Sequence, residues 1–407
     1  MKLLLNWPSL VLSLPLLLLG FSSHADEPSP FKFEVHGIVG ATLYEQSNPD
    51  LLLNGQGPLL ERSQNNATTG GFDVRQTRLS FTVTGPELSF LGIAKPKAVI
   101  EADFFGLNSP GGYGEVSALQ RLRLAYGELN WGNTWVRFGQ DWELLSVNSP
   151  ASLGHVAFPV TWFAGQIGWR EPGMTVYHKF ETGEGSSIEG AFQLIKSDWN
   201  NPYAFGSSTA NDSNVDAGQL SGLPGVEGRV KWSNDHAMAY FAAHWNRVDG
   251  TRASAQVVNI PTANRTFDVA AGKFGGKYTA SKVTLVGEAY YGKNTAPLVG
   301  EGAGFNDAAD VHEGGGWLQA GYNFTPELSL WAVGGISRSN ADDVRASAGK
   351  VFANTVYGGM LQYRTGAFGV GPEIYHVETK SLLASGANAP DGVMDGMQYM
   401  FSANYYF

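Results

Sequence analysis

The sequence predicts an all-β protein, a transmembrane antiparallel β-barrel of about 16 strands with short periplasmic turns and long extracellular loops. Three observations support this fold. Apolar and polar residues alternate along many segments, the connections between these segments alternate between short and long, and no run after residue 26 approaches the roughly 20 apolar residues of a membrane helix. Because only helices and closed barrels satisfy their backbone groups in lipid, a membrane location requires a barrel.

The first 25 residues have the pattern of a secretory signal peptide. Lys2 precedes an apolar run, and Ser23 and Ala25 are the small residues expected before a cleavage site. We therefore expect a signal peptide at 1–25, a barrel at 26–407, and export to the outer membrane of a Gram-negative bacterium.

The composition excludes several classes of protein. The chain has no cysteine, so disulfides, thiolate metal sites and covalently attached haem are excluded, and we expect no cofactor. The formal net charge is −10, and an acidic chain is a poor candidate for binding nucleic acid. With 52 glycines, 12% aromatic residues and no linker, the sequence favours one large β unit over several small domains.

The connections show on which rim the loops lie. Segments such as "WGNT", "SNDH" and "TGA" are tight turns, whereas the connections between them are long, polar and rich in glycine, asparagine, aspartate and serine. Long loops therefore occur at one rim only. The predicted strands are 33–44, 73–84, 90–104, 120–130, 133–142, 166–180, 187–197, 225–233, 236–247, 267–279, 282–293, 312–324, 326–339, 354–364, 367–378 and 396–407.

Pro172 makes the sixth strand ambiguous, because "REPGM" at 170–174 resembles a turn. Splitting the strand there would make the number of strands odd and place the long connection 198–224 at the short-turn rim. We therefore keep Pro172 inside a strand, at a bulge or an irregular end.

The last strand, "MQYMFSANYYF", alternates an apolar face with a more polar one and ends at Phe407. A soluble β-sandwich or a secreted β-solenoid would also alternate in this way. Aromatic residues near the predicted strand ends favour a membrane barrel, where they form two interfacial girdles. The apolar face of the last strand would then contact lipid, and its final phenylalanine resembles the carboxy-terminal signal of outer-membrane proteins.

The strand alternation turns charged residues to the inside of the barrel. With the apolar face outward, the side chains of Leu79 and Phe81 on the second strand point to lipid, and that of Arg78 points into the barrel. Charges at inward positions indicate a wet lumen, because an isolated charge in a dry core is very costly. The predicted pore-lining residues are Arg78, Lys97, Glu101, Asp103, Arg121, Arg123, Arg137 and Asp141.

Three motifs resemble a known family. The segments "VRQTRLSF" (74–81), "RLRLAYGEL" (121–129) and "GQDW" (139–142) are similar to strands of the DcaP-like trimeric porins of Gram-negative outer membranes. The resemblance implies a homotrimeric porin for passive diffusion of small hydrophilic solutes, with a preference for small anions such as carboxylates. The arginine ladder that it implies is Arg75, Arg78, Arg121, Arg123 and Arg137.

The sequence also departs from this family. Leu124 stands where a histidine is expected, Asp141 stands where an uncharged threonine is expected, and the periplasmic helical extension of some members is not seen. Arg75 has outward parity unless a bulge intervenes, so it is also a candidate for binding lipopolysaccharide phosphate at the outer rim.

The arginines have an alternative role that stays open at this stage. Glu101, Asp103 and Asp141 are predicted on the same wall, so the arginines would form a structural ion-pair network instead of binding solute. Two unit charges 4 Å apart are worth only ~1 kcal/mol in water, so either role matters for selectivity only where the pore is narrow.

The loop 143–165 is the predicted constriction loop. Its segment "HVAFPVTWFAG" is too apolar for a solvated loop, so we expect it to fold into the lumen, with Glu143 and His155 as its main polar groups. The alternative is packing against a neighbouring subunit of a trimer.

Other signals are weak. Asp212, Ser213 and Asp216 offer oxygen ligands for Ca²⁺, although a hydrated loop tip is the favoured explanation for them. The histidines have no paired metal spacing, and no motif for a nucleophile or a zinc enzyme occurs, so we expect no metal and no catalytic activity. The alternatives to a porin are a barrel sheath around a partner electron-transfer protein and an outer-membrane enzyme or structural barrel. The expected partners are small hydrophilic solutes, outer-membrane lipid and lipopolysaccharide.

Overall fold

The structure of the chain is a computed structural model. It describes residues 30–48, 67–106, 119–183, 185–199, 215–252, 257–258, 265–300, 310–346, 351–382 and 392–407. The predicted signal peptide lies outside this range, as do Asp212 and Ser213 of the possible calcium loop. In the described part of the chain, no helix has both the length and the apolar character needed to cross a membrane.

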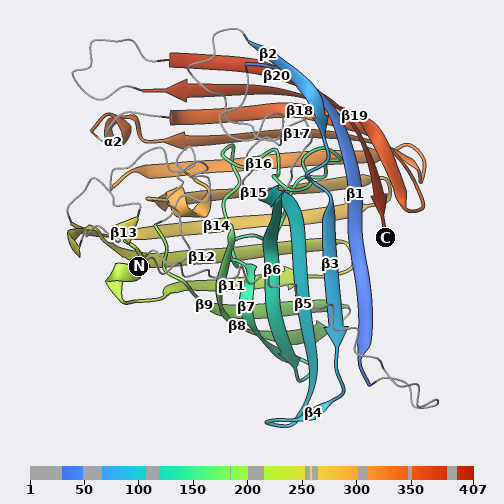
Figure 1. Ribbon diagram of the computed structural model, residues 1–407, viewed down its shortest axis with the longest axis vertical. Helices are drawn as coiled ribbons and strands as arrows, with labels where there is room; N and C mark the ends of the chain where they lie inside the picture. Colours follow the sequence, from blue (N-terminus) through green and yellow to red (C-terminus); the bar gives the residue numbers. More distant parts are fainter. Residues whose placement is uncertain are drawn as a thin grey trace, which may run out of the picture.

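The structure is a closed antiparallel barrel of 16 strands, which confirms the predicted fold (Figure 1). Each strand pairs with the next one along the chain, and β20 pairs with β1 to close the sheet, with Gly40 opposite Asn404. The barrel strands are β1 (Lys32–Ser47), β2 (Thr68–Asp73) with β3 (Arg78–Thr84), β5 (Ile93–Gly106), β6 (Leu119–Asn130), β7 (Thr134–Trp142), β8 (Arg170–Gly183), β9 (Ser186–Ile195), β11 (Gly225–Ser233), β12 (Ala237–Asp249), β14 (Thr266–Ala280), β15 (Val283–Lys293), β16 (His312–Asn323), β17 (Leu328–Ser339), β18 (Val351–Thr365), β19 (Phe368–Ser381) and β20 (Gly392–Tyr406).

Short elements accompany these strands. β4 (Leu88–Ser89) forms a small hairpin with the start of β5, and β10 (Val215–Asp216) pairs in parallel with β13 (Val257–Val258). The short helices are η1 (Gln219–Ser221), η2 (Gly250–Arg252), η3 (Ala296–Leu298) and α2 (Ala341–Ala346).

Pro172 lies inside β8, as the sequence predicted. It pairs with Gln140 on β7, and its side chain faces outward. The pairing of β8 with β7 continues without a register shift on both sides of it. The strand begins at Arg170, four residues later than predicted, because residues 166–169 belong to the preceding loop.

The second predicted strand, 73–84, is wrong as a continuous element. It is broken at 74–77 into β2 and β3, both of which pair with β1. At the break Gln76 turns inward and is fully buried, while Val74 faces outward with 44% of its surface exposed. The break therefore changes which side chains of this segment reach the lumen.

A bulge in β6 has a similar effect. Leu122 pairs with Ala102 and Leu124 pairs with Glu101, so Arg123 is the extra residue between them. The alternation shifts by one residue at this point. Arg123 and the even-numbered residues that follow it consequently all face inward.

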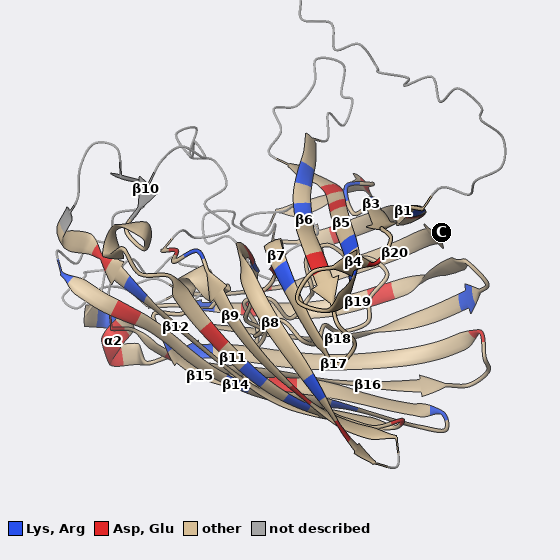
Figure 2. Ribbon diagram, turned by 90° about the horizontal axis from the view of Figure 1, so that it is seen from below, with Lys and Arg blue, Asp and Glu red and all other residues tan. Residues whose placement is uncertain are grey.

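The two faces of the sheet differ in polarity. Exposed apolar side chains cover the outer face, for example Phe81 at 48%, Phe274 at 63% and Leu318 at 61% exposure. Charged residues concentrate on the inner face, and Figure 2 shows basic positions on β6 close to acidic positions on the neighbouring β5. This distribution fits a barrel with lipid outside and water inside.

Candidate functional site

The first group of inward charges lies on β3, β5 and β6. Arg121 and Arg123 both bind Asp103, at 2.6 and 2.9 Å, and Arg123 also donates to Glu101 at 2.6 Å. Arg78 lies 3.7 Å from Glu101, the longest of these ion-pair distances. Only 2% of the Arg123 side chain is exposed, whereas Arg78 and Arg121 are 18% and 15% exposed.

The second group lies closer to the short-turn rim, on β5, β6 and β7. Arg137 binds Glu128 at 2.7 Å and Asp141 at 2.8 Å, and Lys97 binds Glu128 at 2.8 Å. The Arg137 guanidinium also stacks over the Tyr126 ring at 4.7 Å. These contacts connect three neighbouring strands and fix the side chains against the wall.

The charges of the two groups nearly cancel. Five cations face four carboxylates, so the wall carries one net positive charge in these contacts. Arg78 has the weakest ion pair, and its Nε atom is buried without a hydrogen-bond partner among the described residues. The excess positive charge is therefore assigned most directly to Arg78.

The loop 143–165 lies against the inner wall, where Glu373 on β19 binds its middle. The Glu373 carboxylate accepts hydrogen bonds from the backbone N–H groups of Leu153 and Gly154, at 2.8 and 2.6 Å, and from the Ser152 hydroxyl at 2.6 Å. These bonds satisfy the loop backbone inside the barrel. Further contacts join Ala151 to Gln319, Leu153 to Asn404, His155 to Gln398 and Arg78 to Val156.

A buried carboxylate pair holds the base of the loop. Glu143 accepts a hydrogen bond from the Trp169 N–H at 2.7 Å, which ties together the two ends of the loop. Glu227 on β11 accepts hydrogen bonds from the Leu144 N–H and from His244. Burial, together with the nearby Glu227 carboxylate, raises the pKa of Glu143 to about 8.

Glu143, Glu227 and His244 also have possible metal-ligand atoms within 4.8 Å of one another. All three side chains, however, take part in the hydrogen bonds that hold the loop. We therefore assign this group to loop anchoring.

A cavity of about 300 Å³ lies between the docked loop and the arginine wall, beside the hydrogen bond that Arg78 donates to the Val156 carbonyl. Arg78 and Arg123 lie on its wall side and His155 on its loop side, so polar groups of the wall and of the loop face the same space. Its remaining lining residues are Trp142, Ser149, Pro150, Ala151, Ser152, Val156, Ala157, Pro159 and Tyr406.

The structure places the predicted site residues as follows. The eight residues that were predicted to line the pore face inward and form the two groups described above. His155 is buried at 2% exposure and contributes to the cavity, whereas Glu143 is buried at the loop base and does not line it.

Arg75 lies inside the barrel instead of at the outer rim. The break in the second strand turns it inward, where it binds Asp73 at 2.7 Å and stacks over the buried Phe105 ring at 4.7 Å. The hypothesis that Arg75 binds lipopolysaccharide phosphate is therefore wrong for this position.

Several further charged residues that face inward were not predicted from the sequence. Glu128 was missed because simple alternation from Arg123 places it outward, and the bulge reverses that direction. A glutamate facing lipid would have been a signal of the bulge, because such a charge is costly. Arg229 and Lys231, which both bind Glu189, follow the alternation on β11 and could have been found from it.

Comparison with known proteins supports the fold. The outer membrane channel DcaP of Acinetobacter baumannii is similar to this chain with a TM-score of 0.64 and 13% identity, over 93% of this chain and 97% of that one. An anion-selective porin from Comamonas acidovorans gives a TM-score of 0.56 and 13% identity, over 93% and 100%. OmpF of Salmonella typhi, solved with daunomycin, gives 0.57 and 12% identity, over 93% and 98%.

These neighbours establish the porin fold for this chain. No protein-family model matches the sequence, and no curated protein is significantly similar to it. The family resemblance of the three motifs agrees with the similarity to DcaP, which is a similarity of fold at this level of identity.

Proposed function

We propose that the protein is an outer-membrane porin through which small hydrophilic solutes diffuse passively. The observation that carries this proposal is the cavity between the docked loop and the arginine wall, since it provides a polar constriction inside a barrel wide enough for an aqueous channel. The fold of the structural neighbours, which are described as outer membrane channels and porins, supports the same function and location.

We further propose a mild preference for small anions, including carboxylates. Arg78 faces the cavity with a weak ion pair, and the two charge groups on β3, β5, β6 and β7 together retain one net positive charge. The preference is mild because Arg121, Arg123 and Arg137 are neutralised by carboxylates at 2.6 to 2.9 Å. These three arginines support the wall, while Arg78 contacts the solute.

The proposal includes a cleaved signal peptide at 1–25 and assembly as a homotrimer. Trimers occur among the structural neighbours, one of which is a trimer form of an outer membrane protein of Vibrio cholerae. The alternatives are a sheath for a partner electron-transfer protein and an outer-membrane enzyme. Conductance of the purified protein in planar bilayers separates the porin from both alternatives.

A further inference from the structure

The inner wall of the barrel carries a stacked pair of aromatic rings near the short-turn rim. Trp135 on β7 lies directly opposite Tyr177 on β8, and the two ring planes are 8° apart with their centres separated by 5.0 Å. Both side chains face the lumen, because the guanidinium of the inward-facing Arg137 lies 5.5 Å from the centre of the Tyr177 ring. An aromatic surface of this kind is not needed for the passage of ions.

Trp135 is the accessible member of the pair. Tyr177 is only 6% exposed, and Arg229 on β11 lies over its ring at 5.9 Å. Trp135 is partly exposed, and among the described residues no ring other than that of Tyr177 stacks on it. One face of the indole is therefore covered by Tyr177, and the other face is available to a molecule in the lumen.

Charged groups lie on both sides of Trp135 along the wall. We call two groups the flanking ion pairs: Lys97, Glu128 and Arg137 form the first, and Glu189, Arg229 and Lys231 form the second. The strand register places Glu128 and Arg137 one inward position from Trp135 toward the long loops, and Glu189 one inward position toward the short-turn rim. The aromatic surface is thus bordered by polar groups at both ends.

In each of the flanking ion pairs one carboxylate binds two cations. Glu128 binds its partners at 2.8 and 2.7 Å, and Glu189 binds its partners at 2.8 and 3.0 Å. The side chains of Arg137 and Lys231 are 26% and 25% exposed, so their N–H groups reach the lumen beside the carboxylates. The wall therefore offers hydrogen-bond donors and acceptors next to each other.

A neutral sugar matches this combination of groups. The C–H bonds on one face of a sugar ring carry partial positive charge, and the face of an aromatic ring is negative. Sugar hydroxyls both donate and accept hydrogen bonds, as the flanking ion pairs do. An anion, by contrast, would be repelled by Glu128 and Glu189, which already bind the cations.

We propose that Trp135 and the flanking ion pairs form a binding site for a neutral sugar at the short-turn end of the lumen. The sugar ring lies on the free face of the indole, and its hydroxyls contact the two groups of charges. This inference deepens the porin function proposed above, on which it rests, because it names sugars as one class of the hydrophilic solutes.

Saturation-transfer NMR of the intact folded protein tests the proposal, with maltose as the probe and a detergent that has no sugar headgroup. The wild type should show saturable binding of maltose. Trp135→Ala should weaken this binding about tenfold, the value of a well-placed aromatic contact, and Trp135→Phe should keep most of it because an aromatic face remains.

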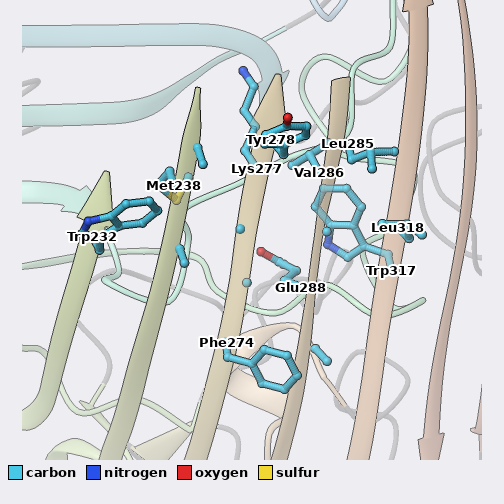
Figure 3. Close-up of a pocket in the computed structure, with 16 residues that line it drawn as sticks. Trp232, Met238, Phe274, Lys277, Tyr278, Leu285, Val286, Glu288, Trp317 and Leu318 are labelled. Carbon is cyan, nitrogen blue, oxygen red and sulfur yellow. The ribbon is translucent and has the colours of Figure 1, made fainter. Parts of the chain in front are cut away.

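The matched control is a second tryptophan near the same rim. Trp232 on β11 follows the inward-facing Lys231 and faces the outside of the barrel. Figure 3 shows it at an apolar groove of about 560 Å³ that Phe274 and Leu285 also line. Trp232→Ala should therefore leave maltose binding unchanged, and a loss equal to that in Trp135→Ala would overturn the proposal.

Benzoate serves as a second probe, because an aromatic carboxylate is the other class of ligand that a ring and cations attract. Its affinity should not change in Trp135→Ala, since carboxylates are directed to Arg78. Benzoate binding that depends on Trp135 as strongly as maltose binding does would assign the site to aromatic anions and overturn the proposal.

The absence of saturable maltose binding in the wild type, or unchanged binding in Trp135→Ala, would also overturn the proposal. Heat-modifiable migration on gels confirms that each variant is folded. Conductance is measured on the same samples. A conducting protein that does not bind maltose would refute the sugar site alone, whereas a protein that binds maltose without conducting would refute the porin function.

Discussion

Replacing Arg78 by glutamine should remove most of the anion preference while leaving the barrel intact. The two charge groups on β3, β5, β6 and β7 carry one net positive charge, and Arg78 is the cation in them with the longest ion pair. A monovalent ion about 5 Å from this charge in water gains or loses ~0.8 kcal/mol, and screening over a Debye length of ~8 Å reduces this to ~0.4 kcal/mol. Because anions and cations shift in opposite directions, the anion-to-cation permeability ratio should fall about fourfold.

Reversal potentials in a salt gradient measure this ratio. Arg78→Lys is the matched control, since it keeps the charge and should keep the selectivity. Arg123→Gln is a useful comparison because it breaks a buried ion pair, a change that costs about 3–5 kcal/mol of stability. If Arg78→Gln retains the wild-type ratio, or if the wild type prefers cations, the assignment of selectivity to Arg78 is refuted.

Two further predictions concern how the loop 143–165 is held. The pKa of Glu143 is raised from 4.5 to about 8, so its protonated form favours docking, and docking should weaken as the pH rises from about 4.5 to above 8. Hydrogen exchange of the Trp169 amide, corrected for the intrinsic exchange rate, should show that its protection falls with rising pH in the wild type but not in Glu143→Gln. The same pH dependence in both proteins would contradict the assignment of this effect to Glu143. Glu373→Gln removes the negative charge that accepts hydrogen bonds from two loop amides, so the free energy of loop docking should fall by about 1.5–3 kcal/mol. A less firmly docked loop should increase the current noise of the open channel. Current noise equal to that of the wild type would argue that the loop is held by other contacts.

The sequence predicted the strands well because their alternation is a local property. β11 begins and ends at the predicted residues, and the inclusion of Pro172 in β8 followed from the alternation of short and long connections. The inward direction of Arg121 and Asp103 also followed from parity, because one face of a membrane barrel must be apolar.

The rest depends on interactions between distant parts of the chain. The break at 74–77 and the bulge at Arg123 each change side-chain direction by one residue, and no local turn signal marks either of them. The ion pairs that neutralise the arginines join different strands, so their partners could be proposed from the sequence but not assigned. The docking of Leu153 on Glu373, 220 residues away, is visible only in the structure.

Conductance in planar lipid bilayers tests the central claim most directly. The folded protein should insert with discrete current steps, and each insertion should close in three equal sub-steps if the protein is a homotrimer of open channels. A barrel shown to be folded by heat-modifiable migration but without conductance would contradict the porin function, and co-purification of such a barrel with a haem protein would favour the sheath.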